Sequence, residues 1–173
     1  YLFNMRFLII IIFLITNAVA EELPGIKNIV IHNMPKTYDN VIFLDKKDQK
    51  ININEYRGNL LVLNFWATWC EPCKEEMPSL DKLQANPELD KIKIFAINIG
   101  KENSEKVNKF FKDFNIKNFE PYFDPPTTLA KMFSLRGVPT SILINKEGQE
   151  FARIIGSIDF ENKNFVSWIK KYN

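Results

Sequence analysis

The sequence contains little that could bind a metal or cross-link a scaffold. Its 173 residues include two cysteines and one histidine, too few for a zinc site with four Cys or His ligands or for a framework of several disulfides. Charge of either sign is also not in excess, with 23 Lys and Arg against 21 Asp and Glu, so no broad basic field supports a nucleic-acid partner. By contrast, 46% of the residues are hydrophobic, enough for a buried core in a chain of this length. The composition therefore indicates an ordered domain with one available cysteine pair.

The first twenty residues have the pattern of a secretory signal peptide. Arg6 precedes a wholly apolar run at 7–15, and Ala18 and Ala20 occupy the small-residue positions before a cleavage site. Even when it is extended to Ala20, this run would span only about 21 Å as a helix, less than the hydrocarbon core of about 30 Å. We expect export and cleavage near Ala20, and membrane anchoring by residues 5–20 is the alternative.

The rest of the chain has no linker, repeat or low-complexity segment, which indicates one domain. Nearly continuous apolar runs at 60–65 and 91–99 predict strands that are buried on both faces. The segment 72–85 between them predicts a helix, which Pro78 should kink. Helical stripes, alternating runs and turn residues indicate the other elements. These are a small hairpin within 41–53; a helix with the stripe Val107, Phe110, Phe111 and Phe114, capped by Asn103 or Ser104; a shorter helix opened by Asp124, Pro125 and Pro126; a hairpin of strands 140–145 and 150–155; and a last helix buried through Phe165, Trp168 and Ile169. Strands that alternate with helices predict an α/β fold with a mixed sheet.

The cysteine pair carries the strongest functional signal. The motif Cys70-Glu71-Pro72-Cys73 lies where a buried strand is followed by a helix, and C-x-x-C in that context indicates redox chemistry. A structural disulfide is the alternative, but closing a loop of four residues contributes only about 1.9 kcal/mol, against about 4.7 kcal/mol for 100 residues. Half a zinc ribbon would lack its second cysteine pair. We therefore interpret the pair as a redox centre.

Position along the helix predicts a role for each residue of the motif. Cys70 lies at the helix N-terminus, where unpaired N–H groups and the helix dipole stabilise a thiolate, so it is the expected nucleophile. Cys73 is then the thiol that resolves a mixed disulfide. Pro72 fits the first helical turn, and Thr68-x-x-Glu71 fits a capping box.

Two further features concern protons and the direction of electron flow. Glu76 lies three residues after Cys73, so it could exchange protons with that thiol or be one more solvated charge; spacing leaves both open. Lys74 and the helix terminus favour a thiolate, whereas Glu71 and Glu76 oppose it by like charge. Since no histidine lies between the cysteines, the balance favours a reductant over a strong oxidant.

Two segments carry a family resemblance. Residues 64–78, Asn-Phe-Trp-Ala-Thr-Trp-Cys-Glu-Pro-Cys-Lys-Glu-Glu-Met-Pro, and residues 136–140, Arg-Gly-Val-Pro-Thr, resemble the thioredoxin superfamily, and within it the TlpA/ResA-like branch. The resemblance implies a thioredoxin fold, a mixed central β-sheet flanked by helices, with an N-terminal β-hairpin and a helix/strand insertion over 100–133. Together with the signal-peptide pattern, it gives three expected parts: a signal peptide at 1–20, a lead-in at 21–35 and a thioredoxin-like domain at 36–173.

The resemblance also implies roles for residues of the site. The peptide bond between Val138 and Pro139 would be cis and would align a substrate chain beside the disulfide. Glu76 would act as an active-site acid, and Asn64 replaces the buried Asp of cytoplasmic thioredoxins. The substrate groove would be formed by Trp69, Pro72, Val138 and Pro139.

The function implied by the resemblance is extracytoplasmic reduction of protein disulfides, in a bacterial periplasm. Members of the branch are recharged by a membrane thiol donor, and several serve apocytochrome c or oxidase copper-site assembly. We expect no cofactor other than the redox disulfide, no resident metal and no nucleic acid, and His32 should be a packed or surface side chain. The alternative is a copper-handling assembly chaperone on the same fold, with Cys70 and Cys73 as soft Cu(I) ligands and Met77 nearby. A peroxidase lacks support, because the cysteines form a close pair.

Overall fold

The computed structural model describes residues 25–173. The predicted signal peptide at 1–20 and the first residues of the lead-in lie outside the described residues. The strands are β1 (Ile29–Lys36), β2 (Ile42–Leu44), β3 (Lys50–Asn52), β4 (Leu60–Trp66), β5 (Ile92–Asn98), β6 (Pro121–Phe123), β7 (Thr140–Ile144) and β8 (Glu150–Ile155). The helices are α1 (Glu71–Gln84), α2 (Ser104–Asp113), α3 (Thr128–Met132) and α4 (Lys163–Ile169), with 3-10 turns at Ile53–Tyr56 and Lys170–Tyr172.

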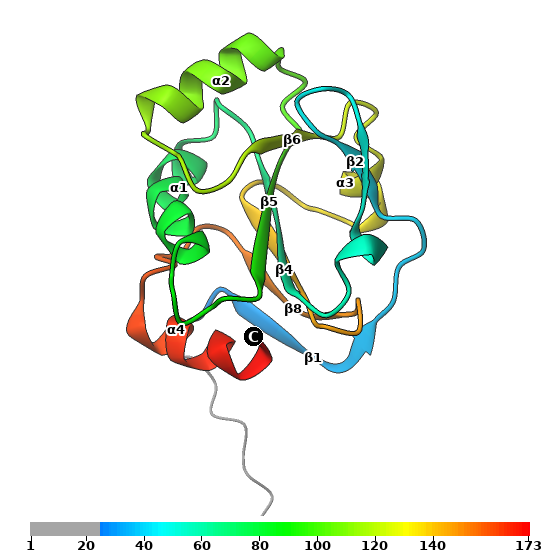
Figure 1. Cartoon of the computed structure of the whole chain (residues 1–173), viewed down its shortest axis with the longest axis vertical. Coiled ribbons are helices and arrows are strands. Elements are labelled where there is room, and N and C mark those ends of the chain that lie inside the picture. Colours follow the sequence, from blue (N-terminus) through cyan, green and yellow to red (C-terminus); the bar gives the residue numbers. More distant parts are fainter. Residues whose placement is uncertain (1–24) are drawn as a thin grey trace, which may run out of the picture.

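One mixed sheet with the strand order β1-β8-β7-β4-β5-β6-β2-β3 forms the middle of the molecule. Its central strand β4 is buried at every position, pairs parallel with β5 and pairs antiparallel with β7. Helices cover both faces: α1, α2 and α4 lie on one side of the sheet and α3 on the other (Figure 1). This is the mixed α/β arrangement that the apolar runs predict, and the early hairpin is present as the antiparallel pair β2 and β3.

The alternation of side chains along β4 divides the core into two clusters. Leu60 and Val62 pack on the side of α1, α2 and α4, whereas Leu61, Leu63 and Phe65 pack on the side of α3. The predicted apolar stripes of α2 and α4 supply much of the first cluster: Val107, Phe110 and Phe111, and Phe165, Trp168 and Ile169. The apolar runs and stripes of the sequence therefore account for most of the packing.

The predicted start of the shorter helix is wrong. Asp124, Pro125 and Pro126 precede α3 as a turn, in which the N–H of Thr127 donates to the carbonyl of Asp124 at 2.8 Å. The helix begins only at Thr128. Asp124 lies four residues earlier in the sequence, but its Oδ2 still accepts from the N–H of Leu129 at 2.8 Å and so caps the helix. A proline disfavours helical backbone at the residue before it, here Asp124 and Pro125, so the helix starts after both prolines.

Two strands, β1 and β6, were not expected from the sequence. β1 begins in the segment 21–35 that was expected to be a lead-in and ends at Lys36, and it pairs antiparallel with β8 at one edge of the sheet. β6 has three residues and pairs parallel with β5. Within residues 25–173, no helix is both long and apolar enough to cross a membrane.

Candidate active site

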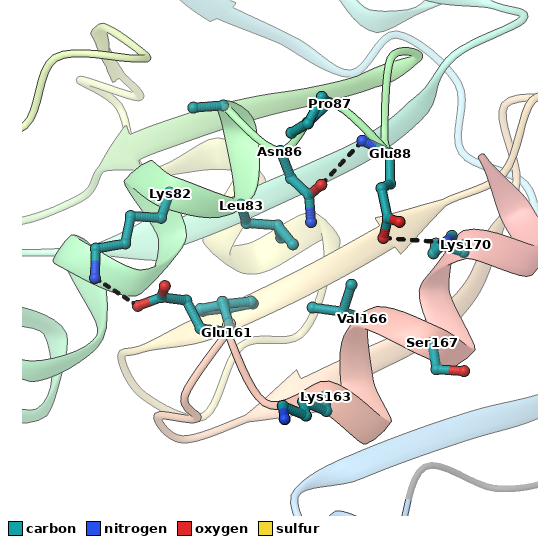
Figure 2. Close-up of a pocket in the computed structure, with 12 residues that line it drawn as sticks. Lys82, Leu83, Asn86, Pro87, Glu88, Glu161, Lys163, Val166, Ser167 and Lys170 are labelled. Atoms are coloured by element: carbon teal, nitrogen blue, oxygen red, sulfur yellow. Dashed lines mark hydrogen bonds and ion pairs between the residues drawn. The ribbon is translucent and has the colours of Figure 1, made fainter.

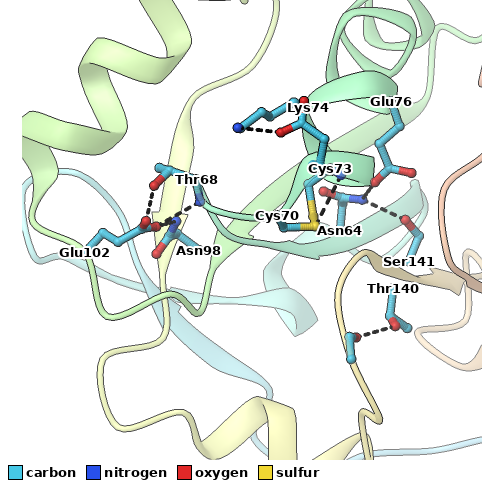
Figure 3. Close-up of a disulfide and its surroundings, with 12 residues drawn as sticks. Asn64, Thr68, Cys70, Cys73, Lys74, Glu76, Asn98, Glu102, Thr140 and Ser141 are labelled. Atoms are coloured by element: carbon cyan, nitrogen blue, oxygen red, sulfur yellow. Dashed lines mark hydrogen bonds and ion pairs between the residues drawn. A yellow bond between two sulfur atoms is a disulfide. The ribbon is translucent and has the colours of Figure 1, made fainter.

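The two cysteines form a disulfide at the junction of β4 and α1 (Figure 3). The S–S distance is 2.13 Å and the Cα atoms of Cys70 and Cys73 are 5.3 Å apart. Cys70 is the N-cap of α1, and its Sγ accepts a hydrogen bond from the N–H of Cys73 at 3.2 Å. This geometry offers the Cys70 sulfur an N–H donor and the positive end of the helix dipole, both of which stabilise a thiolate.

The predicted capping box of Thr68 and Glu71 is wrong. Because Cys70 itself occupies the N-cap position, Thr68 lies two residues before the cap and cannot reach the first turn of α1. The backbone N–H and the hydroxyl of Thr68 both donate to the carboxylate of Glu102 instead. Glu71 pairs with Lys74, whose Nζ lies 2.7 Å from Glu71 Oε2, so the positive charge nearest the disulfide on α1 is shared with a carboxylate.

Glu76 is buried behind the disulfide, which excludes its interpretation as a solvated charge. It is 2% exposed, and its Oε1 accepts from Asn64 Nδ2 at 2.8 Å. The Asn64 amide also donates to Ser141 Oγ at 2.9 Å, so strands β4 and β7 hold the partner of Glu76 in place. Burial raises the pKa of Glu76 to about 8, and the hydrogen bond from Asn64 acts in the opposite direction. The raised pKa favours the protonated form of Glu76 at neutral pH, and Glu76 lies one turn of helix beyond Cys73.

The residues expected to form the substrate groove lie at the same end of the sheet as the disulfide. The Val138-Pro139 peptide bond is cis and directly precedes β7. Because β7 runs antiparallel to β4, its first residue Thr140 pairs with Phe65, close to the end of β4 from which Cys70 follows. The other two residues flank Cys70 in the sequence: Trp69 is 64% exposed, and Pro72 is exposed in the first turn of α1.

Glu102, which was not expected from the sequence, contacts the loop before Cys70. Its carboxylate accepts from the backbone N–H and the hydroxyl of Thr68 and from the amide of Asn98. Burial raises the pKa of Glu102, but the hydrogen bonds from Thr68, Asn98 and Lys106 outweigh it and hold the pKa below its usual range. The sequence signal that could have indicated this part of the site is Asn98, a polar residue at the carboxyl end of the buried parallel strand β5.

A second polar cluster explains His32. The His32 side chain is 10% exposed and its Nε2 lies 2.6 Å from Glu150 Oε1, as expected for a packed histidine. The fully buried Glu150 also contacts Tyr38 and Arg153, at 2.6 Å each. Among residues 25–173, no group of three or more His, Cys, Asp or Glu side chains is placed to hold a metal ion.

A hollow of about 600 Å³ lies away from these residues, between the end of α1 and α4 (Figure 2). Two ion pairs cross it, one between Lys82 and Glu161 at 2.8 Å and one between Lys170 and Glu88 at 3.1 Å. Its lining includes neither cysteine nor any residue of the expected groove. The hollow is therefore separate from the disulfide.

Comparisons with known proteins agree with this geometry. The family model described as the AhpC/TSA family matches residues 34–149. Thiol-disulfide oxidoreductase ResA of Bacillus cereus is 33% identical over 121 residues, which cover 70% of this chain and 69% of that protein. ResA of Bacillus subtilis is 30% identical over 119 residues, 69% of this chain and 65% of that protein. The matched segment thus spans about two thirds of the length of these relatives.

Solved structures confirm the fold. StoA from Bacillus subtilis superposes with a TM-score of 0.64 at 26% identity and covers 78% of this chain and 98% of its own. A DsbF homologue from Corynebacterium diphtheriae gives a TM-score of 0.70 at 22% identity, over 87% of this chain and 96% of its own. With its C-x-x-C disulfide at the start of α1, the chain belongs to the AhpC/TSA family as a thioredoxin-fold, ResA-like thiol-disulfide oxidoreductase.

Proposed function

We propose that this oxidoreductase reduces disulfides of protein substrates, with Cys70 as the nucleophile and Cys73 as the resolving thiol. The observation that carries the proposal is the position of the Cys70 sulfur, at the N-cap of α1 and in contact with the N–H of Cys73. A thiolate at Cys70 is thereby stabilised, and Cys70 is 4% exposed, whereas Cys73 is fully buried. An incoming disulfide therefore meets Cys70 first.

The proposed reaction moves two electrons from the dithiol to the substrate. The Cys70 thiolate attacks one sulfur of the substrate disulfide, and the other substrate sulfur leaves as a thiolate. Cys73 then attacks the Cys70 sulfur of the mixed disulfide, which forms the Cys70–Cys73 bond and releases the second substrate thiolate. A dithiol donor must reduce this bond again before the next turnover.

Glu76 is proposed to handle the proton of Cys73. In the oxidised protein its raised pKa keeps it protonated, so it can protonate the Cys73 thiolate that leaves when the donor attacks Cys70. The ionised Glu76 then takes the proton back when Cys73 resolves a mixed disulfide. A pKa of about 8 is close to that of an ordinary thiol, so neither transfer is strongly uphill.

Substrate chains are proposed to lie across Trp69, Pro72 and the Val138-Pro139 segment, which flank the disulfide at one end of the sheet. The proposed direction of electron flow, reduction of substrates, is supported by the charges near the sulfurs. Lys74, which could stabilise the reactive thiolate, is paired with Glu71 at 2.7 Å. A less stabilised thiolate makes the dithiol a better reductant.

The proposed location is outside the cytoplasm, in a bacterial periplasm, after export directed by residues 1–20. A membrane thiol donor would supply the electrons, and substrates would include apocytochrome c or proteins of oxidase copper-site assembly. These proposals rest on the signal-peptide pattern of the sequence and on its resemblance to the TlpA/ResA-like branch.

The test is reduction of insulin disulfides by the full chain in the presence of a dithiol donor. Cys70→Ser should abolish the activity, because no thiolate remains at the helix N-terminus. Substitution of the exposed Glu75 by Gln should leave it unchanged. Activity that survives in Cys70→Ser would overturn the proposal. Tight binding of one Cu(I) by the reduced protein, dependent on both thiols, would instead favour the copper-handling alternative.

A further inference from the structure

Glu102 links the end of β5 and the first turn of α2 to the loop that leads to Cys70 (Figure 3). Its Oε2 accepts from the backbone N–H of Thr68 at 3.0 Å and from Asn98 Nδ2 at 2.8 Å. Its Oε1 accepts from the Thr68 hydroxyl and lies 3.2 Å from Lys106 Nζ. The Glu102 side chain is 5% exposed, so little water competes with Thr68 and Asn98 for its oxygens.

The space for this carboxylate depends on the absence of a side chain at residue 100. A Cβ on Gly100 would lie 2.5 Å from Glu102 Oε2 and 3.0 Å from the Cβ of Ala67. Since Gly100 is outside the left-handed region of φ, the requirement is room for Glu102 and not an unusual backbone conformation. Gly100 thus allows Glu102 to fold back against the loop.

The loop that Glu102 holds carries the reactive groups. The N–H of Cys70 donates to the carbonyl of Ala67 at 3.2 Å, which closes a turn over residues 67–70. Thr68 is the second residue of this turn and is fixed by Glu102, whereas the third residue, Trp69, is largely exposed. The direction in which Cys70 and Trp69 face an incoming substrate therefore depends on where Thr68 is held.

We propose that Glu102 is a positioning residue of the oxidoreductase, which fixes the turn at 67–70 and so sets the approach of a substrate sulfur to Cys70. Glu102 acts through Thr68 and does not touch the reacting sulfurs. This inference rests on the proposed function, because it assumes that Cys70 is the nucleophile. Figure 3 places Glu102 and Glu76 on opposite sides of the disulfide, so the two carboxylates have separate roles.

The first test compares Glu102→Ala with Glu102→Gln in insulin reduction. Glu102→Ala removes every bond to Thr68 and should lower kcat/KM by about tenfold, because misplaced reacting groups are costly. Glu102→Gln should recover most of this loss: its amide oxygen can still accept from the Thr68 N–H, and its NH2 group can donate to the Thr68 hydroxyl. Glu105→Gln removes an exposed carboxylate three residues further along the chain, in the first turn of α2, and serves as the matched control.

The second test moves Glu102 without removing its charge. Gly100→Ala places a methyl group against Glu102 Oε2, so it should lower kcat/KM as Glu102→Ala does. The pH midpoint for alkylation of Cys70 in the reduced protein should also shift upward, because a loosened turn weakens the N–H contact that stabilises the thiolate. A purely structural role of Glu102 would lower stability without moving this midpoint.

The outcomes are distinct. If Glu102→Ala and Gly100→Ala both keep kcat/KM within about twofold of the wild-type value, or if only their unfolding free energies fall, the inference is overturned. If Glu102→Ala does not fold, Thr68→Val removes only the hydroxyl contact and should still lower kcat/KM. Failure of the proposed function would appear separately, as activity retained in Cys70→Ser.

Discussion

At the scale of single residues, Glu76 should give the protein a distinctive pH dependence of stability. Its pKa is raised by burial to about 8 from a usual value of 4.5. At a pH between 4.5 and about 8, the folded protein keeps a proton at Glu76 that the unfolded chain has lost. Stability should therefore fall as the pH rises through this window, by up to about 1.4 kcal/mol per pH unit, and level off above it. Urea unfolding of the oxidised protein from pH 5 to 9 measures this fall, which Glu76→Gln should abolish.

The neighbouring carboxylate supplies the control for this measurement. Glu75 is exposed, so Glu75→Gln should keep the slope of the wild-type protein. Glu102 and Glu150 have lowered pKa values, so their stabilising contributions are lost only as the pH falls below the usual carboxyl range. Equal slopes in the wild-type protein and in Glu76→Gln would mean that Glu76 is ionised throughout the window.

Single residues also show what local sequence can and cannot predict. Cys73 and Glu76 belong to α1 and Cys70 is its N-cap, so spacing alone places the three residues along successive turns at the start of one helix. The burial of Glu76 could not be predicted from spacing, because it depends on Asn64 and on strands that pair far apart in the sequence. Glu102 was missed for the same reason, since it lies 34 residues from its partner Thr68.

At the scale of elements, Asp124 should be important for the stability of α3. It is 3% exposed, and its two oxygens accept from the N–H of Leu129 and the hydroxyl of Thr128. Asp124→Ala leaves these donors unpaired at the start of a short helix and should lower the free energy of unfolding by about 1 to 2 kcal/mol. Urea unfolding measures this change. Asp39→Ala, which alters an exposed aspartate, is the control, and equal effects of the two substitutions would show that the cap is unimportant.

The elements that were predicted correctly are those with long, regular patterns. The runs that form β4 and β5 lie within one residue of their expected bounds, and the predicted stripes of α2 and α4 pack into the core. By contrast, β6 has only three residues, and its strand conformation comes from pairing with β5. β1 was missed because its identity as a strand depends on β8, more than a hundred residues later in the chain. Short or edge strands carry too little local pattern to be recognised from sequence.

At the scale of the whole molecule, charge gives a substrate little guidance toward the disulfide. The formal net charge of the chain is only +2, and several exposed charges are paired with one another, as those of Lys82 and Glu161 are across the hollow in Figure 2. Long-range electrostatic steering requires a field of one sign. Selection among substrates should therefore depend on short-range contacts at the end of the sheet where Trp69 is exposed.

The natural substrates should be captured by a variant that cannot resolve the mixed disulfide. In Cys73→Ala, Cys70 can attack a substrate disulfide but the mixed disulfide cannot be resolved, so covalent complexes should accumulate in the compartment where the protein works. The amount trapped should change little between about 0.01 M and about 0.15 M salt, because screening removes little attraction. Mass spectrometry after non-reducing electrophoresis identifies the captured proteins. Additional replacement of Cys70 by Ser should abolish every complex, and Trp69→Ala should reduce their amount. Equal trapping with and without the Trp69 indole would show that this side chain does not select substrates.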